Sequence, residues 1–243
     1  MSASVSIIIP ALNEAEAIGR TLAATRESAT ASAAKARSDP ADGESFPIEM
    51  IVVDGGSTDA TAAIARSCGA VVVSSPPGRA RQMNAGARVA RGECLLFLHA
   101  DTRLPPGYEQ EVRRVLDLPG VVAGAFALQI AGTGWRLRLV ERAANLRSRL
   151  FELPYGDQGL FLRAEVFRSL GGFPELPLME DLELVRLLRR RGKIMTSPLA
   201  AATSARRWES VGVVRATLLN QFFLLAYLLG MPPRRIASWY YKQ

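Results

Sequence analysis

A histidine and an aspartate stand two positions apart in "LFLHADTRLP", residues 96–105, directly after a run of apolar residues. The apolar run predicts a buried strand, and side chains two positions apart on a strand project to the same side. His99, the only histidine of the chain, and Asp101 would therefore reach the space beyond the strand end together. Imidazole and carboxylate groups bind divalent cations, so a cation site is the chemistry that this pair could support.

Three more polar segments follow apolar runs. They are "PALNEA" at 10–15, "VDGGSTD" at 53–59 and "SSPPGRARQMNAG" at 74–86. In the last of these, Arg79 and Arg81 stand at the start of a predicted helix, where positive charge is locally unfavourable. Arginine side chains and the free N–H groups of a helix start can together hold a diphosphate, and the alternative is a pair of solvated arginines.

Alternating strands and helices through the first half of the chain would position these segments. Strands are expected at residues 5–10, 48–54, 70–75 and 94–101, with helices beginning near Ala15, Asp59 and Arg79. Strands that are apolar at every position are buried on both faces, which predicts a mostly parallel sheet with helices on both sides. The expected fold class is therefore α/β, in which ligands bind beyond the carboxyl ends of the strands.

Composition and missing motifs exclude or weaken several other classes. The 49% hydrophobic content excludes a disordered chain, and the two cysteines have no spacing typical of a zinc site or a disulfide scaffold. A dinucleotide-binding fold would carry glycines after the first strand, where residues 10–15 have none. The same absence weakens the hypothesis of a sugar-nucleotide nucleotidyltransferase.

Five motifs, taken in order, resemble glycosyltransferase family 2, which has the Rossmann-like GT-A fold. They are "SIIIPALNEA", "IVVDGGSTDAT", "GRARQMNAGARVARGECLLFLHADT", "GGFPE" and "MEDLELVRLLRRRG". The resemblance implies a GT-A domain over residues 1–200, with a nucleotide-binding half at about 1–103 and an acceptor half at about 104–200. It also implies an inverting, metal-dependent enzyme that moves a sugar from a nucleoside diphosphate sugar, with a UDP-sugar as the expected donor, to a hydroxyl acceptor.

The resemblance assigns roles to individual residues of the donor site. Asp54 would accept a hydrogen bond from the nucleotide base, although an ordinary Asp-Gly-Gly turn is the alternative. The family's Asp-x-Asp motif has His99 in its first position and Asp101 in its second. Asp101 would therefore hold Mg²⁺ or Mn²⁺, with His99 as a second metal ligand, a ribose contact or a structural residue. The expected donor-binding residues are Pro10, Leu12, Asn13, Glu14, Asp54, Gly55, Arg79, His99, Ala100 and Asp101.

An inverting transfer also needs a carboxylate opposite the leaving diphosphate, because the acceptor hydroxyl loses its proton as it attacks. Asp181 in "MEDLEL" aligns with the family's base, and Glu180 is the alternative. Acids in a first helical turn also stabilise the helix dipole, which is the structural explanation for both. Asp157 and Gln158, between glycines in "YGDQGLF", are expected to bind the acceptor unless they form a plain turn.

Two further motifs bear on the acceptor. The segment "TSARRW" resembles the Gln-x-x-Arg-Trp motif of processive relatives, but Ser204 replaces the glutamine, so we expect a single sugar transfer. The segment "LHADTRLP" is similar to small members associated with arsenosugar biosynthesis, and a lipid is the rival acceptor. A non-catalytic binding module with this fold at the membrane surface is the alternative function, but Asp101 and Asp181 together favour catalysis.

The basic character of the chain lies in its last quarter. Residues 186–243 carry eleven Lys or Arg and one acid, whereas residues 1–185 have a net charge of −3. Residues 201–243 are expected to form a basic, apolar helical extension, whose apolar run at 222–231 is too short to cross a bilayer. The run either packs on the catalytic domain or contacts lipid. The arginines favour an anionic membrane surface, and no nucleic-acid-binding module is recognisable. We therefore expect a cytoplasmic protein that associates peripherally with the inner face of the cell membrane.

Overall fold

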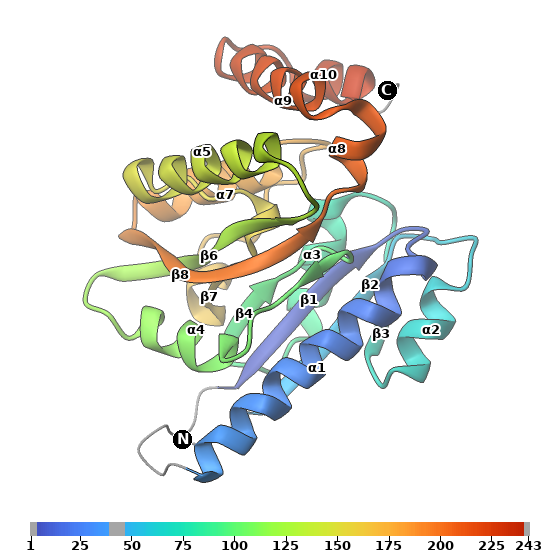
Figure 1. The fold of residues 1–243 in the computed structure, drawn as a ribbon, viewed down its shortest axis with the longest axis vertical. Coiled ribbons are helices and arrows are strands. Elements are labelled where there is room, and N and C mark those ends of the chain that lie inside the picture. Colours follow the sequence, from blue (N-terminus) through green and yellow to red (C-terminus); the bar gives the residue numbers. More distant parts are fainter. Residues whose placement is uncertain (1–3, 39–46, 241–243) are drawn as a thin grey trace.

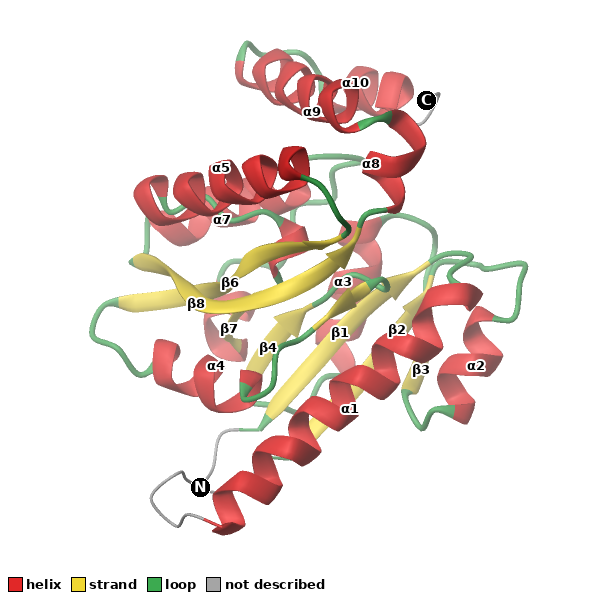
Figure 2. Ribbon diagram, viewed as in Figure 1, coloured by secondary structure: helices red, strands yellow, loops and turns green. Residues whose placement is uncertain are grey.

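The structure, a computed structural model, describes residues 4–38 and 47–240, which form an eight-stranded sheet with helices on both sides (Figure 1, Figure 2). The strand order is β3-β2-β1-β4-β7-β6-β8-β5. The strands are β1 (Val5–Ala11), β2 (Ile48–Asp54), β3 (Val71–Ser74), β4 (Cys94–Phe97), β5 (Thr102–Arg103), β6 (Val121–Ala131), β7 (Leu160–Arg163) and β8 (Lys193–Ser204). The helices are α1 (Ala15–Ser38), α2 (Thr61–Ser67), α3 (Arg79–Val89), α4 (Tyr108–Leu116), α5 (Trp135–Phe151), the 3₁₀ turn η2 (Gly156–Gln158), α6 (Ala164–Ser169), α7 (Glu180–Arg189), α8 (Arg206–Val211), α9 (Val213–Leu228) and α10 (Pro233–Tyr240).

The first half of the chain forms the parallel part of the sheet, as predicted. Strands β3, β2, β1 and β4 run parallel to one another. Ile7 and Ile9 of β1 belong to the core under α1 and α2, whereas Ile8 between them belongs to the core under α3. A strand that is apolar at every position therefore contributes to two hydrophobic cores, one on each face of the sheet.

The second half makes the sheet mixed. Strand β7 is antiparallel to β4 and to β6, β8 is parallel to β6, and the short β5 pairs antiparallel with the outer edge of β8. The α/β fold class predicted from the sequence is confirmed, and the parallel arrangement extends from β3 as far as β4.

The predicted helical extension forms α8, α9 and α10, which follow β8 and lie at the same end of the molecule as α5 (Figure 1). Phe223 and Ala226 of α9 pack with Leu178 and with Ile236 and Ala237 of α10. The extension therefore packs on the catalytic domain through one of its faces. None of the described helices is both long and apolar enough to cross a membrane.

Helix α3 lies very close to the sheet at Gly86. A Cβ atom on Gly86 would lie 2.5 Å from Cγ2 of Ile8 and 2.9 Å from Cγ2 of Val53, closer than side chains pack. Glycine at this position therefore sets the separation between α3 and the sheet, and with it the position of Arg79 at the start of α3.

Gly86→Val should force α3 away from the sheet and lower the free energy of unfolding by about 1–3 kcal/mol, the usual cost of overpacking a core. Urea unfolding followed by circular dichroism measures the loss. Arg88→Ala, on the exposed side of the same helix, is the matched control and should change stability by less than about 0.5 kcal/mol. An equal loss in both variants would contradict the packing argument.

Candidate active site

Two adjoining cavities lie beyond the carboxyl ends of β1 and β4. The first, of about 740 Å³, is bordered by the β1–α1 loop and the start of α3. The second, of about 280 Å³, is bordered by η2, the start of α7 and helices α8–α10. Arg79, His99, Asp101 and Tyr240 line both cavities, so the cavities meet at these side chains. This is the edge of an α/β sheet at which ligands bind.

The strand that leads to His99 is shorter than predicted. Strand β4 ends two residues before His99, whose carbonyl accepts the N–H of Thr102 at 3.1 Å in a turn. The next residue of β1 that faces β4 is Pro10, which has no N–H to extend the ladder. The prediction that His99 and Asp101 project side by side from a strand is therefore wrong, although both line the same two cavities.

The expected donor-binding residues divide into two groups. Pro10, Leu12, Glu14 and Ala100 line the first cavity, together with the residues at its border with the second. Asn13, Asp54 and Gly55 do not line either cavity in the described part of the chain.

The second group ties neighbouring loops together. Asn13 has a φ of +54°, its N–H donates to Oγ of Ser57 at 2.9 Å, and its side-chain oxygen accepts the N–H of Thr58 at 2.9 Å. Asp54, only 9% exposed, accepts the N–H of Ser57 at 3.2 Å. These bonds fix the β1–α1 and β2–α2 loops relative to each other. Contact of Asp54 with a nucleotide base stays a prediction.

Gln82 of α3 anchors this corner of the site. Its side-chain nitrogen donates to the carbonyl oxygens of Ala11 and Val53, both at 2.8 Å, and so joins the ends of β1 and β2. Gly55 packs directly on it, since a Cβ atom there would lie 2.9 Å from the same nitrogen. Gln82 lies within the motif at residues 78–102, but the sequence does not single it out, because a glutamine in a helix is recognisable as an anchor only when its partners are known.

Arg79 and Glu180 form an ion pair between the two halves of the chain. Arg79 begins α3, as predicted, and its Nε lies 2.9 Å from Oε1 of Glu180 at the start of α7. The Glu180 side chain is only 3% exposed and does not line the second cavity. Its carboxylate is instead paired with Arg79. Arg81 instead pairs with Glu175 at the surface, at 3.2 Å.

Asp181, the next residue of α7, lines the second cavity. Its Oδ2 accepts the N–H of Gly156 at 2.9 Å. Gly156 also lies against His99, because a Cβ atom on it would be 3.1 Å from Nε2 of His99 and 3.4 Å from Oδ2 of Asp181. Of the two carboxylates considered as the base, the geometry therefore favours Asp181 over Glu180.

His99 is uncharged near neutral pH. Burial lowers its pKa to about 4 and the charge of Arg79 acts in the same direction, whereas Asp101 and Asp181 oppose the shift more weakly. A neutral imidazole keeps a lone pair on one nitrogen, with which it can bind a cation or accept a hydrogen bond.

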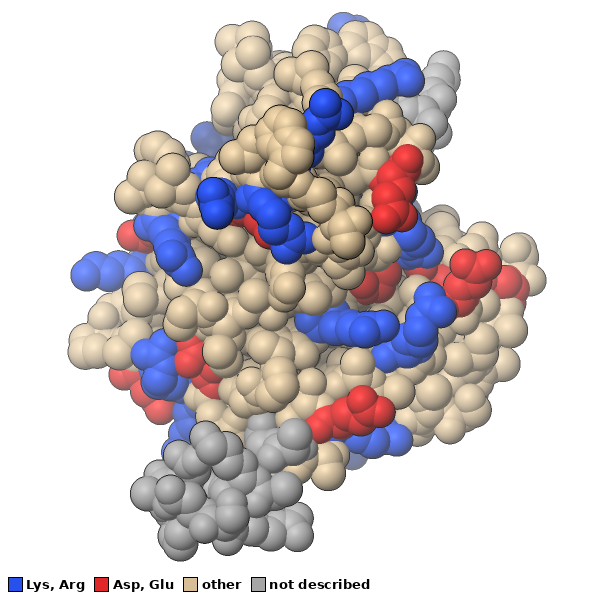
Figure 3. All heavy atoms as spheres, in the orientation of Figure 1, with Lys and Arg blue, Asp and Glu red and all other residues tan. Residues whose placement is uncertain are grey.

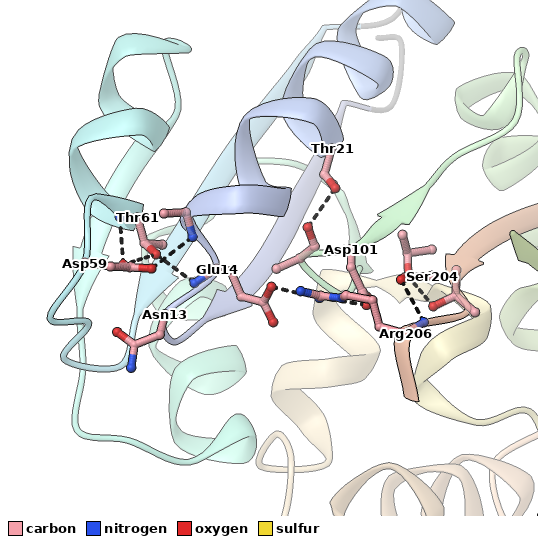
Figure 4. Close-up of polar contacts among 12 residues, drawn as sticks. Asn13, Glu14, Thr21, Asp59, Thr61, Asp101, Ser204 and Arg206 are labelled. Carbon is pink, nitrogen blue, oxygen red and sulfur yellow. Dashed lines mark hydrogen bonds and ion pairs between the residues drawn. The ribbon is translucent and has the colours of Figure 1, made fainter. Parts of the chain in front are cut away.

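Arg206 of α8 bridges two of the expected donor-site carboxylates (Figure 4). Its Nη2 lies 2.9 Å from Oε2 of Glu14 and 3.0 Å from Oδ2 of Asp101. Hydrogen bonds to Glu14 and Asp101 raise the pKa of the guanidinium, which is charged in any case. The helical extension thus places a cation between two of the expected donor-binding residues. Arg234 and Tyr240 of α10 also line the first cavity.

Aromatic side chains from four elements surround the second cavity. They are Tyr155 before η2, Trp208 of α8, Phe223 of α9 and Tyr240 of α10. Tyr240 is in turn covered by the guanidinium of Arg207, whose Cζ lies 4.3 Å from the ring centre. Three of the four aromatic residues belong to the extension, so the extension encloses this cavity.

The two expected acceptor-binding residues have different surroundings. Asp157 lines the second cavity. Gln158 has no exposed surface, its side-chain nitrogen donates to the carbonyl of Phe126 at 3.0 Å, and its side-chain oxygen accepts the hydroxyl of Ser148 at 2.7 Å. Gln158 therefore supports the loop that carries Asp157 and does not reach the cavity.

The family model described as "Glycosyl transferase family 2" matches residues 6–171. The chain belongs to glycosyltransferase family 2. No curated protein matches the sequence of this family 2 member.

Solved structures share the fold at low sequence identity. Glucosyl-3-phosphoglycerate synthase from Mycobacterium tuberculosis, in complex with Mn²⁺, UDP and glucosyl-3-phosphoglycerate, is 20% identical with a TM-score of 0.61, over 95% of this chain and 81% of that chain. A mannosyltransferase from Pyrobaculum calidifontis, in complex with GDP-mannose and Mn²⁺, is 18% identical with a TM-score of 0.65, over 98% of this chain and 69% of that chain. TarS from S. aureus is 18% identical with a TM-score of 0.59, over 83% of this chain and 60% of that chain. The likeness establishes the GT-A fold expected from the sequence.

Asp157→Asn should stabilise this glycosyltransferase at pH 7 but not at pH 4. Burial raises the pKa of Asp157 to about 6, above its ordinary value of 3.8, so the folded state loses stability as pH rises through this range. Asparagine does not titrate, and its advantage should reach on the order of 1 kcal/mol at pH 7. Urea unfolding at both pH values measures the difference. An advantage that is the same at pH 4 and pH 7 would contradict the burial argument.

Proposed function

We propose that this family 2 glycosyltransferase moves one sugar from a nucleoside diphosphate sugar, with a UDP-sugar as the expected donor, to a hydroxyl acceptor and inverts the anomeric configuration. The observation that carries the proposal is the position of Asp181 on the second cavity, next to the border that the cavities share at Arg79. A donor in the first cavity and an acceptor in the second would meet at this border.

Inversion follows from a single displacement. The acceptor oxygen attacks the anomeric carbon while the bond from that carbon to the diphosphate breaks, and the carboxylate of Asp181 accepts the hydroxyl proton. The N–H groups of Gly156 and Leu182 orient this carboxylate at 2.9 and 2.8 Å. Arg79 and the start of α3 offer positive charge to the leaving diphosphate.

The residues at the border suit Mg²⁺ or Mn²⁺ with phosphate co-ligands. Asp101 offers a carboxylate with a side chain 25% exposed, and His99 offers a neutral nitrogen. The described residues contain no group of three His, Cys, Asp or Glu that could hold a metal ion, so waters and diphosphate oxygens would complete the coordination. The Mn²⁺ in the related complexes supports this assignment. A bound cation would neutralise the charge that develops on the diphosphate.

The proposal also covers the type of acceptor and the location of the enzyme in the cell. The presence of Ser204 in place of the processive motif's glutamine supports a single transfer. The resemblance to members associated with arsenosugar biosynthesis supports a small-molecule acceptor, and the basic apolar extension supports a lipid one. We place the enzyme at the inner face of the cell membrane, in peripheral contact through its C-terminal helices.

Asp181→Asn should leave donor affinity nearly unchanged but lower transfer by about two to four orders of magnitude, the usual contribution of a positioned base. Calorimetry with the nucleotide sugar and release of nucleoside diphosphate measure the two quantities. Glu183→Gln is the matched control, because this carboxylate on the same helix pairs with Arg186 and Tyr227 away from the cavities.

A product with retained anomeric configuration would contradict the single displacement. A wild-type chain that binds the donor but transfers no sugar to any hydroxyl acceptor would support the non-catalytic binding module instead.

Asp101→Asn and Arg206→Gln should change cation binding in opposite directions. Loss of the carboxylate should weaken Mn²⁺ binding by about tenfold or more, a loss seen even for residues that only support metal ligands. Loss of the guanidinium frees Glu14 and Asp101 for the cation, so Mn²⁺ should bind about fivefold more tightly, which corresponds to about 1 kcal/mol. Electron paramagnetic resonance of free Mn²⁺ measures both without nucleotide. Equal affinity in all three proteins would show that the cation binds elsewhere.

A further inference from the structure

Helix α5 carries apolar side chains on two opposite faces. Leu137, Ala144 and other residues at helical spacing are buried against the domain. On the opposite face Trp135, Leu146 and Leu150 are 68%, 58% and 65% exposed. In the described part of the chain nothing covers these outward apolar side chains, and an exposed apolar stripe of this kind is typical of an interaction surface.

Helix α9 repeats the arrangement. Its inner face buries Ala216 and Phe223, whereas Leu218 and Phe222 on the outer face are 64% and 50% exposed. Phe222 stacks on Trp239 of α10, with ring centres 6.5 Å apart, so α10 continues the exposed stripe. Helices α5 and α9 contact each other and lie with α10 at one end of the molecule (Figure 1).

Most of the exposed large apolar side chains in the described residues lie on these three helices or, for Leu229, at the C-cap of α9, and only Leu12, Val71, Val89 and Met195 lie elsewhere. We call this set the outer apolar surface. It consists of Trp135, Leu139, Leu146, Leu150, Phe151, Val214, Leu218, Phe222, Leu225, Leu228, Leu229 and Trp239.

The charge around the outer apolar surface is strongly one-sided. Helices α5, α9 and α10 carry eight arginines and a single acid, Glu141, which is itself buried and paired with Arg138 at 2.9 Å. Arg147 is directed inward onto the ring of Tyr155, and Arg234 lines the first cavity. The exposed arginines beside the outer apolar surface are therefore Arg136, Arg142, Arg149, Arg215 and Arg235. In Figure 3 basic side chains lie beside uncharged surface in this part of the molecule. A second copy of the chain would bring its own five exposed arginines against these, whereas an anionic surface would neutralise them.

We propose that the outer apolar surface docks on an anionic lipid bilayer. Helices α5, α9 and α10 lie flat in the boundary between headgroups and acyl chains, with their apolar stripes directed into the bilayer and their arginines at the phosphates. Trp135 and Trp239 are the residue type that favours this boundary. The sequence alone pointed to the C-terminal extension, and α5 is the part that the structure adds.

Docking in this orientation also indicates what kind of acceptor the site would take. This inference rests on the function proposed above. Phe222 belongs to the outer apolar surface, while its neighbour Phe223 lines the second cavity. The wall of that cavity is therefore also the layer in contact with the bilayer. An acceptor with its hydroxyl near Asp181 and an apolar tail at the membrane fits this geometry.

Cosedimentation of the full chain with phosphatidylglycerol-containing vesicles and with phosphatidylcholine vesicles tests the docking. Binding should require the anionic lipid and weaken as salt rises. The double variant Leu150→Ser/Leu218→Ser should bind at least tenfold more weakly. Arg142→Gln/Arg149→Gln, at two exposed positions, should lose about fivefold per charge, because each basic side chain near an anionic surface contributes about 1 kcal/mol.

Val71→Ser/Val89→Ser is the matched control, since these valines are 49% and 43% exposed but lie outside the outer apolar surface. It should bind vesicles like wild type. Absence of binding to anionic vesicles at low salt, or equal binding by the leucine variant and the control, would overturn the proposal. A dimer in sedimentation equilibrium that the leucine variant abolishes, without vesicle binding, would assign the surface to a second copy.

Different experimental outcomes would contradict the proposed docking and the proposed sugar transfer. Asp181→Asn should bind vesicles like wild type, because its substitution lies in the cavity. Vesicle binding by a chain that transfers no sugar would overturn only the proposed function. Sugar transfer to a soluble acceptor by a chain that does not bind vesicles would overturn the docking and the proposed place at the membrane, but not the proposed reaction.

Discussion

The ion pair between Arg79 and Glu180 is the contact on which the geometry of the site depends. A carboxylate only 3% exposed needs a charged partner, because an unpaired charge in a protein interior is costly. The pair joins the start of α3 to the start of α7, and so fixes the first half of the chain against the second half. Asp181 follows Glu180 in α7, so this contact also sets its position relative to Arg79.

A second set of buried polar contacts completes the frame. Gln82 joins the ends of β1 and β2, and Gln158 supports the loop whose Gly156 N–H orients Asp181. Neither glutamine is exposed by more than a few per cent. Buried amides with all their partners in place make loops rigid, since losing any one partner leaves a desolvated polar group. Gln82 also lines the first cavity, whereas Gln158 holds its loop from outside both cavities.

The C-terminal helices have two faces with different surroundings. Their inner side brings Arg206 to Glu14 and Asp101 and encloses the second cavity with aromatic rings. Their outer side carries apolar residues together with Arg215 and Arg235, and neither α9 nor α10 contains an acidic residue. A divalent cation would compete with Arg206 for the carboxylates of Glu14 and Asp101, so cation binding would be linked to the position of α8. This link would connect events in the donor site to the helices proposed to contact the membrane.

The sequence by itself determined the α/β class, the parallel first half, the start of α3 at Arg79 and the family, because apolar runs, helix starts and motifs are local patterns. Even the early end of β4 is encoded locally, by Pro10, but recognising it requires knowing which strand is the neighbour. Only the tertiary structure buried Glu180 and Gln158, and brought Arg206 to Asp101 from more than a hundred residues away. The outward stripe of α5 was decided in the same way. Helical spacing shows that a helix has two apolar faces, but only packing determines which of them is covered.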